Sequence, residues 1–291
     1  MHGAPLGAGV HPTRRILLVA LAVLAVASLV GCSNGGQPSN KVIVSGSTTI
    51  LPIAEQSAES FMKSNPDTNI LVSGLGSSAG IEAVSAGTAN IGTSSRDLKP
   101  EEQSLGLVDT PIAYDGIAVI VSPENPVAGL TKQQLQDIFA GKITNWREVG
   151  GQDRPIELVN RDEASGTREA FNKLVMGTAG FDTAAAVLPG TGQVRDVVAR
   201  AVGAVGYISA GFVEPRFTDI RVKAISVDGI APTEQNIASA KYPIGRTLHF
   251  FTKGAPTGLT KKYVDYVLSD AVQKGVVVDA GFIPIAEGQH R

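Results

Sequence analysis

The chain of 291 residues carries 25 Lys and Arg against 27 Asp and Glu, and 43% of its residues are apolar. This slightly acidic balance argues against nucleic acid as a partner, because proteins that bind nucleic acid show a net basic face. It does not exclude a small anionic ligand, whose binding depends on a few local groups. The length suits one large domain or two smaller ones.

The first 31 residues have the features of a signal peptide. Arg14 and Arg15 precede an apolar run over 16–30, which at about 15 residues is shorter than the ~20 that span a bilayer. Cys32 follows shortly after the run, as in the signals that a lipoprotein signal peptidase cleaves. We therefore predict a lipoprotein signal peptide over 1–31 and lipid attachment at Cys32. An ordinary secretory signal and an uncleaved anchor helix are the alternatives.

The composition of the chain supports acylation of Cys32. It is the only cysteine, so it cannot form an internal disulfide, and a free thiol would be a liability in an exported protein. The polar stretch 32–40 predicts a flexible tether. Without Arg14 and Arg15, 23 basic residues face 27 acidic ones, giving a net charge of −4. We expect an extracytoplasmic protein, in a periplasm or on the outer face of the cell membrane.

Beyond residue 40, strand-like and helix-like segments alternate along the chain, which favours an α/β architecture. In the first half we expect strands at 41–45, 70–73, 89–93 and 112–121, and helices at 52–64 and from the glycine-rich turn at 76 through 86.

In the second half, Thr131 and Gln134 have the spacing of a capping box, which predicts a helix over 131–140. We further expect strands at 156–160, 206–209 and 248–252, and helices at 193–202, at 261–274 and from the loop 161–167 through 176.

Three of the expected strand-to-helix junctions combine glycine with hydroxyl side chains: 46–49 (GSTT), 76–78 (GSS) and 165–167 (SGT). The start of a helix has unpaired N–H groups and a partial positive charge, so such junctions can bind oxyanions. At any one of them, a simple helix cap is the alternative. Three junctions at the carboxyl ends of strands favour an anion site, because open α/β sheets bind ligands there.

Two arginines follow expected strands and could pair with such an anion. Arg161 precedes the third junction by four residues, close enough for a bidentate contact. Arg96 is the second candidate, and its alternative is a surface arginine paired with Asp97 or a nearby glutamate.

The segment 76–80 (GSSAG) also matches the nucleophile elbow of serine hydrolases, with Ser78 as the nucleophile. Against this interpretation, the only histidine between 41 and 289 is His249, which lies within an apolar strand, and no HGGG-type oxyanion segment precedes the elbow. The remaining histidines are terminal and the single cysteine is assigned to the lipid, so we expect no metal site.

The chain resembles the phosphate-binding proteins of bacterial phosphate ABC transporters, in segments that follow one another from about residue 41 to 286. The segments are 45–52 (SGSTTILP), 74–80 (GLGSSAG), 130–146 (LTKQQLQDIFAGKITNW), 160–171 (NRDEASGTREAF), 203–212 (GAVGYISAGF) and 281–285 (GFIPI).

This resemblance implies a two-lobe periplasmic-binding-protein (Venus flytrap) fold of the α/β class, with phosphate held between lobes that are joined by crossing hinge strands. Lobe one would comprise 41–113 plus 245–291, and lobe two 114–244. The strands would cross near 112–119 and 244–249. The ligand residues that carry over are Ser47, Thr48, Thr49, Ser77, Arg161, Ser165, Gly166 and Thr167.

One position departs from the best-known members of that family, in which an aspartate after the third strand accepts the proton of phosphate. Ser95 stands there in this chain, followed by Arg96 and Asp97. Sulfate has no such proton, so a buried carboxylate would favour phosphate over sulfate. Shorter members resemble this chain in a Ser-Arg pair here and an Asp-Gly in the first crossing strand. We therefore predict Asp115 as the acceptor, with Asp97 second, and a structural hydrogen bond as the alternative for Asp115.

The predicted function is capture of inorganic phosphate and its delivery to an ABC importer. We place Ser95, Arg96 and Asp115 in the site with the residues named above. We expect no enzymatic activity, no cofactor, a monomer, and the permease subunits as partners. Binding of another tetrahedral oxyanion such as sulfate is the nearest alternative, and a secreted serine hydrolase using Ser78 is the other.

Overall fold

The structure is a computed structural model that describes residues 1–3, 40–214, 216 and 218–286. The chain from Ser39 onward forms one compact unit. Cys32 and almost all of the predicted signal peptide and tether lie outside the described residues. In the described part, no helix has the length and apolar character needed to cross a membrane.

The described strands form a continuous sheet in the order β2-β1-β3-β10-β4-β8-β6-β7, with β9 beside β4 and β5 beside β9. Strands β1, β2 and β3 pair in parallel, as do β6, β7 and β8, whereas β4 and β10 pair antiparallel. The strands are β1 (Lys41–Gly46), β2 (Asn69–Gly74), β3 (Ile91–Ser94), β4 (Leu107–Val121), β5 (Gly129–Leu130), β6 (Glu157–Arg161), β7 (Ala186–Leu188), β8 (Ala204–Ser209), β9 (Lys223–Val227) and β10 (Gly245–Lys253).

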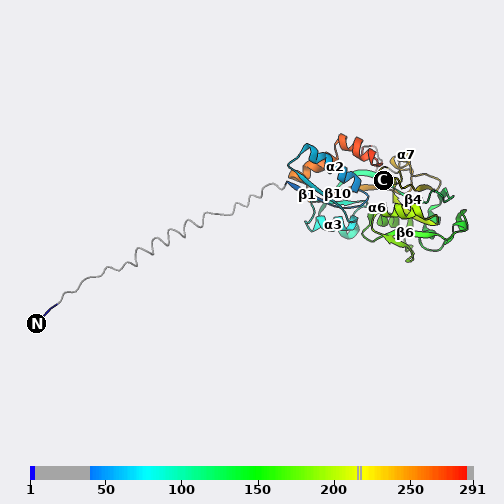
Figure 1. The fold of residues 1–291 in the computed structure, drawn as a ribbon, viewed down its shortest axis with the longest axis horizontal. Coiled ribbons are helices and arrows are strands. Elements are labelled where there is room, and N and C mark those ends of the chain that lie inside the picture. The colour runs from blue at the N-terminus through cyan, green and yellow to red at the C-terminus, as the bar shows by residue number, and fades with distance from the viewer. Residues whose placement is uncertain (4–39, 215, 217, 287–291) are drawn as a thin grey trace. The chain divides into compact units, whose positions relative to one another are not determined.

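Helices cover both faces of the sheet. In Figure 1, α2 and α3 flank β1 on opposite sides. The α-helices are α2 (Leu51–Ser64), α3 (Ser77–Ser85), α4 (Lys132–Phe139), α5 (Gly166–Phe171), α6 (Thr191–Arg200), α7 (Glu234–Ala238) and α8 (Gly258–Val267). Shorter 3-10 or π-helical segments are η2 (Pro100–Leu105), η3 (Trp146–Val149), η4 (Asn172–Met176), η5 (Ala210–Phe212) and η6 (Val272–Val277).

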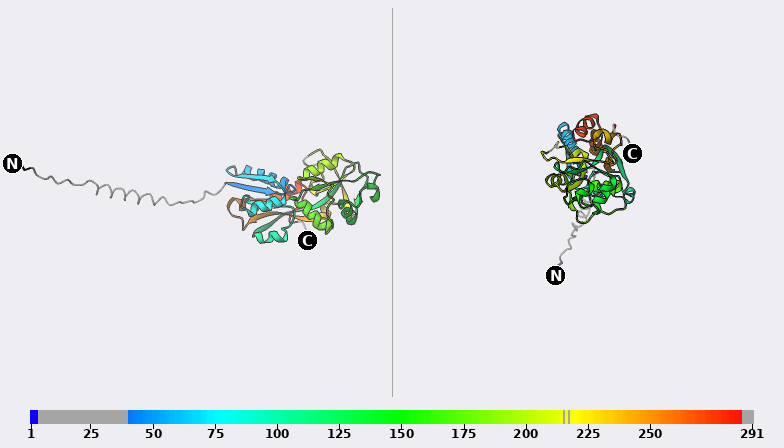
Figure 2. Two further views of the ribbon diagram at one scale, coloured as in Figure 1. Left: turned by 90° about the horizontal axis from the view of Figure 1, so that it is seen from below. Right: turned by 90° about the vertical axis from the view of Figure 1, so that its right-hand side faces the viewer.

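Strand β4 runs through both lobes of the molecule (Figures 1 and 2). Its first part pairs with β10, and from Ile117 to Val121 it pairs with β8 and β9. The ends of β4 are therefore built into two different sets of strands, and the chain crosses between the lobes close to Asp115. The start of β10 at Gly245 lies directly beside this crossing, opposite Gly116.

Two buried clusters form the main cores. One lies around β1, α2 and α8, with Phe61, Phe250 and Tyr263 among its residues. The other lies around α4, α5 and the second half of β4, where Phe171 and Tyr207 stack at a centroid distance of 4.2 Å. The predicted lobe limits stay a prediction, because three side chains pack across them: Phe212 packs against the first cluster, and Ile283 and Ile285 pack in or against the second. Ile283, from the C-terminal segment, also pairs with Tyr114 at the crossing.

Most expected elements occur within a few residues of their predicted positions, and the capping box of Thr131 and Gln134 forms as predicted. The helix expected over 261–274 is interrupted, because α8 ends at Val267 and a separate segment begins at Val272. Ser269 Oγ donates to Tyr266 O at 2.6 Å in this break, a local contact that competes with helix continuation. Strands β5, β7 and β9 and helix α7 were not expected from the sequence.

Candidate functional site

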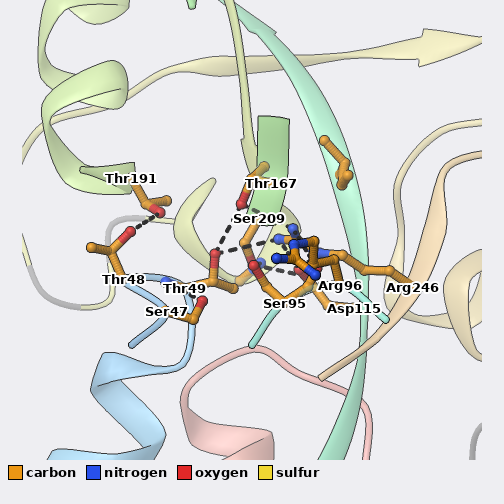
Figure 3. Close-up of polar contacts among 12 residues, drawn as sticks. Ser47, Thr48, Thr49, Ser95, Arg96, Asp115, Thr167, Thr191, Ser209 and Arg246 are labelled. Atoms are coloured by element: carbon orange, nitrogen blue, oxygen red, sulfur yellow. Dashed lines mark hydrogen bonds and ion pairs between the residues drawn. The ribbon is translucent and has the colours of Figure 1, made fainter. Parts of the chain in front are cut away.

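The turn after β1 directs two threonines toward lobe two. Gly46 has φ +142°, and a Cβ on it would lie 2.2 Å from Thr93 O, so the close approach of the two strands requires glycine here. Ser47 N donates to Thr93 Oγ1 at 2.7 Å, and Ser47 Oγ accepts from Thr49 N at 3.2 Å. The Ser47 hydroxyl is thus engaged inside the turn. The hydroxyls of Thr48 and Thr49 instead point away from the turn, toward Thr191 and Thr167 (Figure 3).

Thr48 meets an arginine and a second threonine, and we call Arg161, Thr48 and Thr191 the first triangle. Arg161 donates to Thr48 Oγ1 and Thr191 Oγ1, both at 3.3 Å, and the two hydroxyl oxygens lie 3.1 Å apart. Arg161 also donates from Nε to Leu188 O at 3.1 Å and from Nη2 to Pro189 O at 2.8 Å. The carbonyls hold the guanidinium in place, and one Nη1 hydrogen has no partner among the described residues.

Arg161 is a buried cation that forms no ion pair with any described residue. Only 2% of it is exposed, and no Asp or Glu in the described part of the chain lies within salt-bridge distance. Burial lowers the pKa of Arg161 to about 10, because the charged form loses its hydration, although the nearby charge of Asp162 acts in the opposite direction. An unpaired buried charge is costly. An anion placed against the free Nη1 hydrogen would remove that cost.

Thr49 belongs to a second triangle, formed by Arg246, Thr49 and Thr167. Arg246 donates from Nη1 to Thr167 Oγ1 at 2.9 Å and from Nη2 to Thr49 Oγ1 at 3.4 Å. The two hydroxyl oxygens lie 3.2 Å apart (Figure 3). Each triangle therefore joins one threonine of the turn after β1 to one threonine of lobe two, with a guanidinium contacting both.

The second triangle differs from the first in its charge, because Arg246 is paired with Asp115. Nε and Nη2 of Arg246 donate to Asp115 Oδ2 at 2.9 and 2.7 Å, and Ser209 Oγ donates to Asp115 Oδ1 at 2.8 Å. Complete burial raises the pKa of Asp115 above its usual value, although Arg246 and Ser209 act in the opposite direction. Burial likewise lowers the pKa of Arg246, against the attraction of Asp115.

The remaining two junctions meet each other across the lobes. Ser77 Oγ accepts from Ser95 N at 3.1 Å and lies 3.4 Å from Ser95 Oγ. A Cβ on Gly166 would lie 2.2 Å from Ser77 Oγ, and Ser78 N donates to Ala164 O at 3.1 Å. Only a residue without a side chain permits this contact at position 166.

Ser165 follows the alternative interpretation of its junction, because its hydroxyl caps α5 by accepting from Arg168 N at 3.2 Å. Thr167, two residues later, lies in the second triangle. The third junction thus divides its side chains between capping the helix and facing the turn after β1.

Arg96 is buried but directed at a glutamate. Its Nη1 and Nη2 donate to Glu102 at 2.6 and 2.7 Å, and Nη2 also donates to Ser78 Oγ at 3.2 Å. This is close to the alternative interpretation of Arg96, a pairing with a nearby glutamate, except that the side chain is only 4% exposed. Its Nε is buried without a hydrogen-bond partner among the described residues.

Asp97, the second candidate acceptor, lies on a more exposed surface and pairs with Lys173 of lobe two at 3.1 Å. Its other carboxylate oxygen is 3.5 Å from Nε2 of His249, whose Nδ1 lies 2.8 Å from Asp109 Oδ1. The neighbouring His249 and Lys173 lower the pKa of Asp97 well below its usual range, although burial opposes them.

The contacts of Ser78 and His249 do not form a catalytic triad. Ser78 Oγ accepts from Arg96, and His249 contacts Asp109, while no Ser78–His249 hydrogen bond occurs in the described part of the chain. In the same part, no group of three or more His, Cys, Asp and Glu side chains could hold a metal ion.

The model of the PBP superfamily domain matches residues 33–271. The phosphate-binding protein PstS of Bacillus subtilis (strain 168) is 36% identical over 291 residues, covering 94% of this chain and 93% of that protein. The chain belongs to this family of phosphate-binding proteins. PstS of Borreliella burgdorferi is 30% identical over 279 residues and covers 92% of this chain and 98% of that protein.

Solved structures of the family agree with the fold. A putative phosphate ABC transporter substrate-binding protein from Clostridium perfringens, with bound phosphate, is 38% identical at a TM-score of 0.79. It covers 84% of this chain and 99% of that chain. An ABC-type phosphate transport receptor from Vibrio cholerae is 34% identical at a TM-score of 0.70, covering 83% and 99%. These relatives confirm the predicted family and the two-lobe periplasmic-binding-protein fold.

Sequence reasoning overlooked three residues of the site: Thr191, Ser209 and Arg246. Thr191 follows Gly190 at the start of α6, so a fourth glycine-hydroxyl junction was present in the sequence. Arg246 directly follows Gly245 at the predicted second crossing, where a charged residue beside a buried strand could have drawn attention. Ser209 gave no separate signal, because it ends an apolar strand.

Proposed function

We propose that this chain is an extracytoplasmic solute-binding protein that captures inorganic phosphate between its lobes and delivers it to an ABC importer. Relatives named phosphate-binding protein PstS, and a related structure with bound phosphate, support phosphate as the ligand. The family consists of binding proteins of transporters, which agrees with the prediction that the chain is not an enzyme.

The first triangle is the observation that carries this proposal. Arg161 is buried, lacks a carboxylate among the described residues, and has an unused N–H beside hydroxyls from both lobes. Charged and bidentate hydrogen bonds to oxyanions are the strong ones, and guanidinium suits phosphate geometry. A tetrahedral oxyanion there would satisfy the cation and take further hydrogen bonds from the threonines.

Binding would couple to closure of the lobes. The lobes contact one another through threonine pairs, through Ser78 N and Ala164 O, and through ion pairs such as Lys173–Asp97. In the mechanism we propose, the anion exchanges water for N–H, hydroxyl and guanidinium donors while the lobes close on it. The closed form would then be what the importer recognises.

The residue assignments form part of the same proposal. We assign phosphate binding to the hydroxyl, glycine and arginine positions predicted from the sequence, with Arg161, Thr48, Thr49 and Thr167 supported most directly by the contacts. We further propose lobe limits at 113/114 and 244/245, a monomer, the permease subunits as partners, and a lipid anchor at Cys32 that keeps the protein beside its transporter.

Calorimetric titration of purified protein beginning at Lys41 tests the proposal. Phosphate should bind tightly and with defined stoichiometry, and excess sulfate should not compete at pH 6 or pH 8. Sulfate binding of comparable strength at both pH values would replace phosphate by a general oxyanion as the ligand. No binding of either anion would refute the proposed function.

A further inference from the structure

The pair Asp115–Arg246 bears on how the site selects its anion. The two residues are cross-strand partners where β4 and β10 meet, and their side chains are only 1% and 4% exposed. One oxygen of Asp115 accepts twice from Arg246 and the other accepts from Ser209. The carboxylate is therefore surrounded by donors of the protein itself.

Arg246, in contrast, faces the threonines of both lobes. A guanidinium has only donors, so each hydroxyl that it contacts must accept and must direct its own hydrogen elsewhere. Thr49 and Thr167 both accept from Arg246. If one of them donates to the other across their 3.2 Å separation, the pair still keeps one hydrogen for an anion. The 3.4 Å contact from Nη2 to Thr49 is long, so that N–H can also turn to an anion at small cost.

The charges of Arg161, Arg246 and Asp115 add up to one net positive charge at the two triangles. Arg246 is balanced by Asp115 at 2.7 Å, whereas Arg161 has no carboxylate within salt-bridge distance in the described part of the chain, and Asp162 acts on it only from beyond that distance. A site with a single positive charge matches a monoanion. Phosphate can bind as a protonated monoanion, whereas sulfate is a dianion that would bring excess negative charge into a buried site.

We propose that Asp115 sets the anion selectivity by cancelling the charge of Arg246, and that Arg246 is a further anion-binding residue of the site. This differs from the prediction made from the sequence, in which Asp115 accepts the phosphate proton directly. The inference rests on the proposed function, since it concerns how the phosphate site rejects sulfate.

The ratio of the dissociation constants for sulfate and phosphate separates the two mechanisms. Asp115→Asn adds one positive charge to the site, and the ratio should fall by about tenfold or more. Both mechanisms share this expectation. In the double variant Asp115→Asn/Arg246→Gln the carboxylate is still absent but the site charge returns to its original value. The ratio should then return to within about threefold of the original protein, while both anions bind more weakly.

A double variant that discriminates as poorly as Asp115→Asn would overturn the proposal, because the missing carboxylate alone would then explain the loss. Arg246→Lys is the matched control, since it keeps the positive charge but lacks the bidentate geometry of the guanidinium. It should lower the affinity for phosphate and leave the ratio of the two dissociation constants unchanged. Failure of the unchanged protein to bind phosphate would refute the proposed function and this inference with it, whereas the ratios measured for the variants refute this inference alone. Thermal unfolding of each variant verifies that it is folded.

A structure of the phosphate complex gives an answer that does not depend on any variant. We expect an N–H of Arg246 within hydrogen-bond distance of a phosphate oxygen, and both Asp115 oxygens still bound to Arg246 and Ser209. A short contact of about 2.5–2.7 Å between an Asp115 oxygen and a phosphate oxygen would show direct acceptance of the proton and would refute the proposal.

Discussion

Replacement of Arg161 tests the site most directly. Arg161→Met keeps much of the apolar stem and removes the guanidinium, together with the free Nη1 hydrogen and the two 3.3 Å contacts to Thr48 and Thr191. Hydrogen bonds to charged groups contribute about 1.5–3 kcal/mol each. Loss of a buried charge partner costs about 2–5 kcal/mol in binding, or roughly 30-fold to 5,000-fold in the dissociation constant.

The assay is calorimetric titration with phosphate, using Arg161→Lys as the matched control. Lysine keeps the charge but cannot donate to Leu188 O, Pro189 O and an anion in one fixed geometry. We therefore expect it to bind phosphate more weakly than the original protein and more tightly than Arg161→Met. Phosphate binding by Arg161→Met within about threefold of the original would refute the assignment of Arg161 as the main anion contact.

Three further predictions follow from individual contacts. Thr191→Val removes the lobe-two hydroxyl of the first triangle and should weaken phosphate binding by about tenfold in the same titration, with an unchanged melting temperature; equal affinity would exclude Thr191 from the site. Gly166→Ala introduces a Cβ 2.2 Å from Ser77 Oγ, so closure should become less favourable by about 1–3 kcal/mol. Small-angle scattering at saturating phosphate should then show a larger radius of gyration, and a radius equal to that of the original protein would contradict the contact. For His249, burial lowers the pKa, but the carboxylates of Asp109 and Asp97 more than offset this and raise it above its usual value. The stability it contributes is present below the unfolded pKa of about 6.5 and is lost as pH rises through the folded pKa. Chemical denaturation should show this loss in the original protein and not in His249→Gln.

The sequence was informative wherever local chemistry decides structure. Glycine and hydroxyl residues at strand ends predicted the three junctions, and Thr131 with Gln134 predicted a helix start that forms as expected. These features depend on neighbours within a few positions along the chain. The interruption at Ser269 was not apparent from the sequence, because the spacing of apolar residues does not distinguish one continuous helix from two consecutive helical segments.

The pairing of Arg246 with Asp115 could not be predicted in this way. Arg246 reaches Asp115 from 131 positions away, whereas Arg96 pairs with Glu102, six positions away, as its alternative interpretation allowed. Arg96 follows β3, whereas Arg246 is the second residue of β10, and neither position shows in the sequence which carboxylate its side chain will meet. Only the register between β4 and β10 places Arg246 opposite Asp115, and register follows from the sheet as a whole.

The arrangement of the two triangles gives a physical reason why closure should depend on the anion. Thr48 and Thr49 are consecutive, yet their hydroxyls contact different threonines of lobe two, so both contacts form only when the lobes meet in one orientation. In this closed arrangement Arg161 is buried and forms no ion pair among the described residues, which opposes closure of the empty protein. An oxyanion removes this penalty only when the lobes are closed around it. The free energy of binding is therefore directed into closure, and a ligand that lacks negative charge would gain little from it.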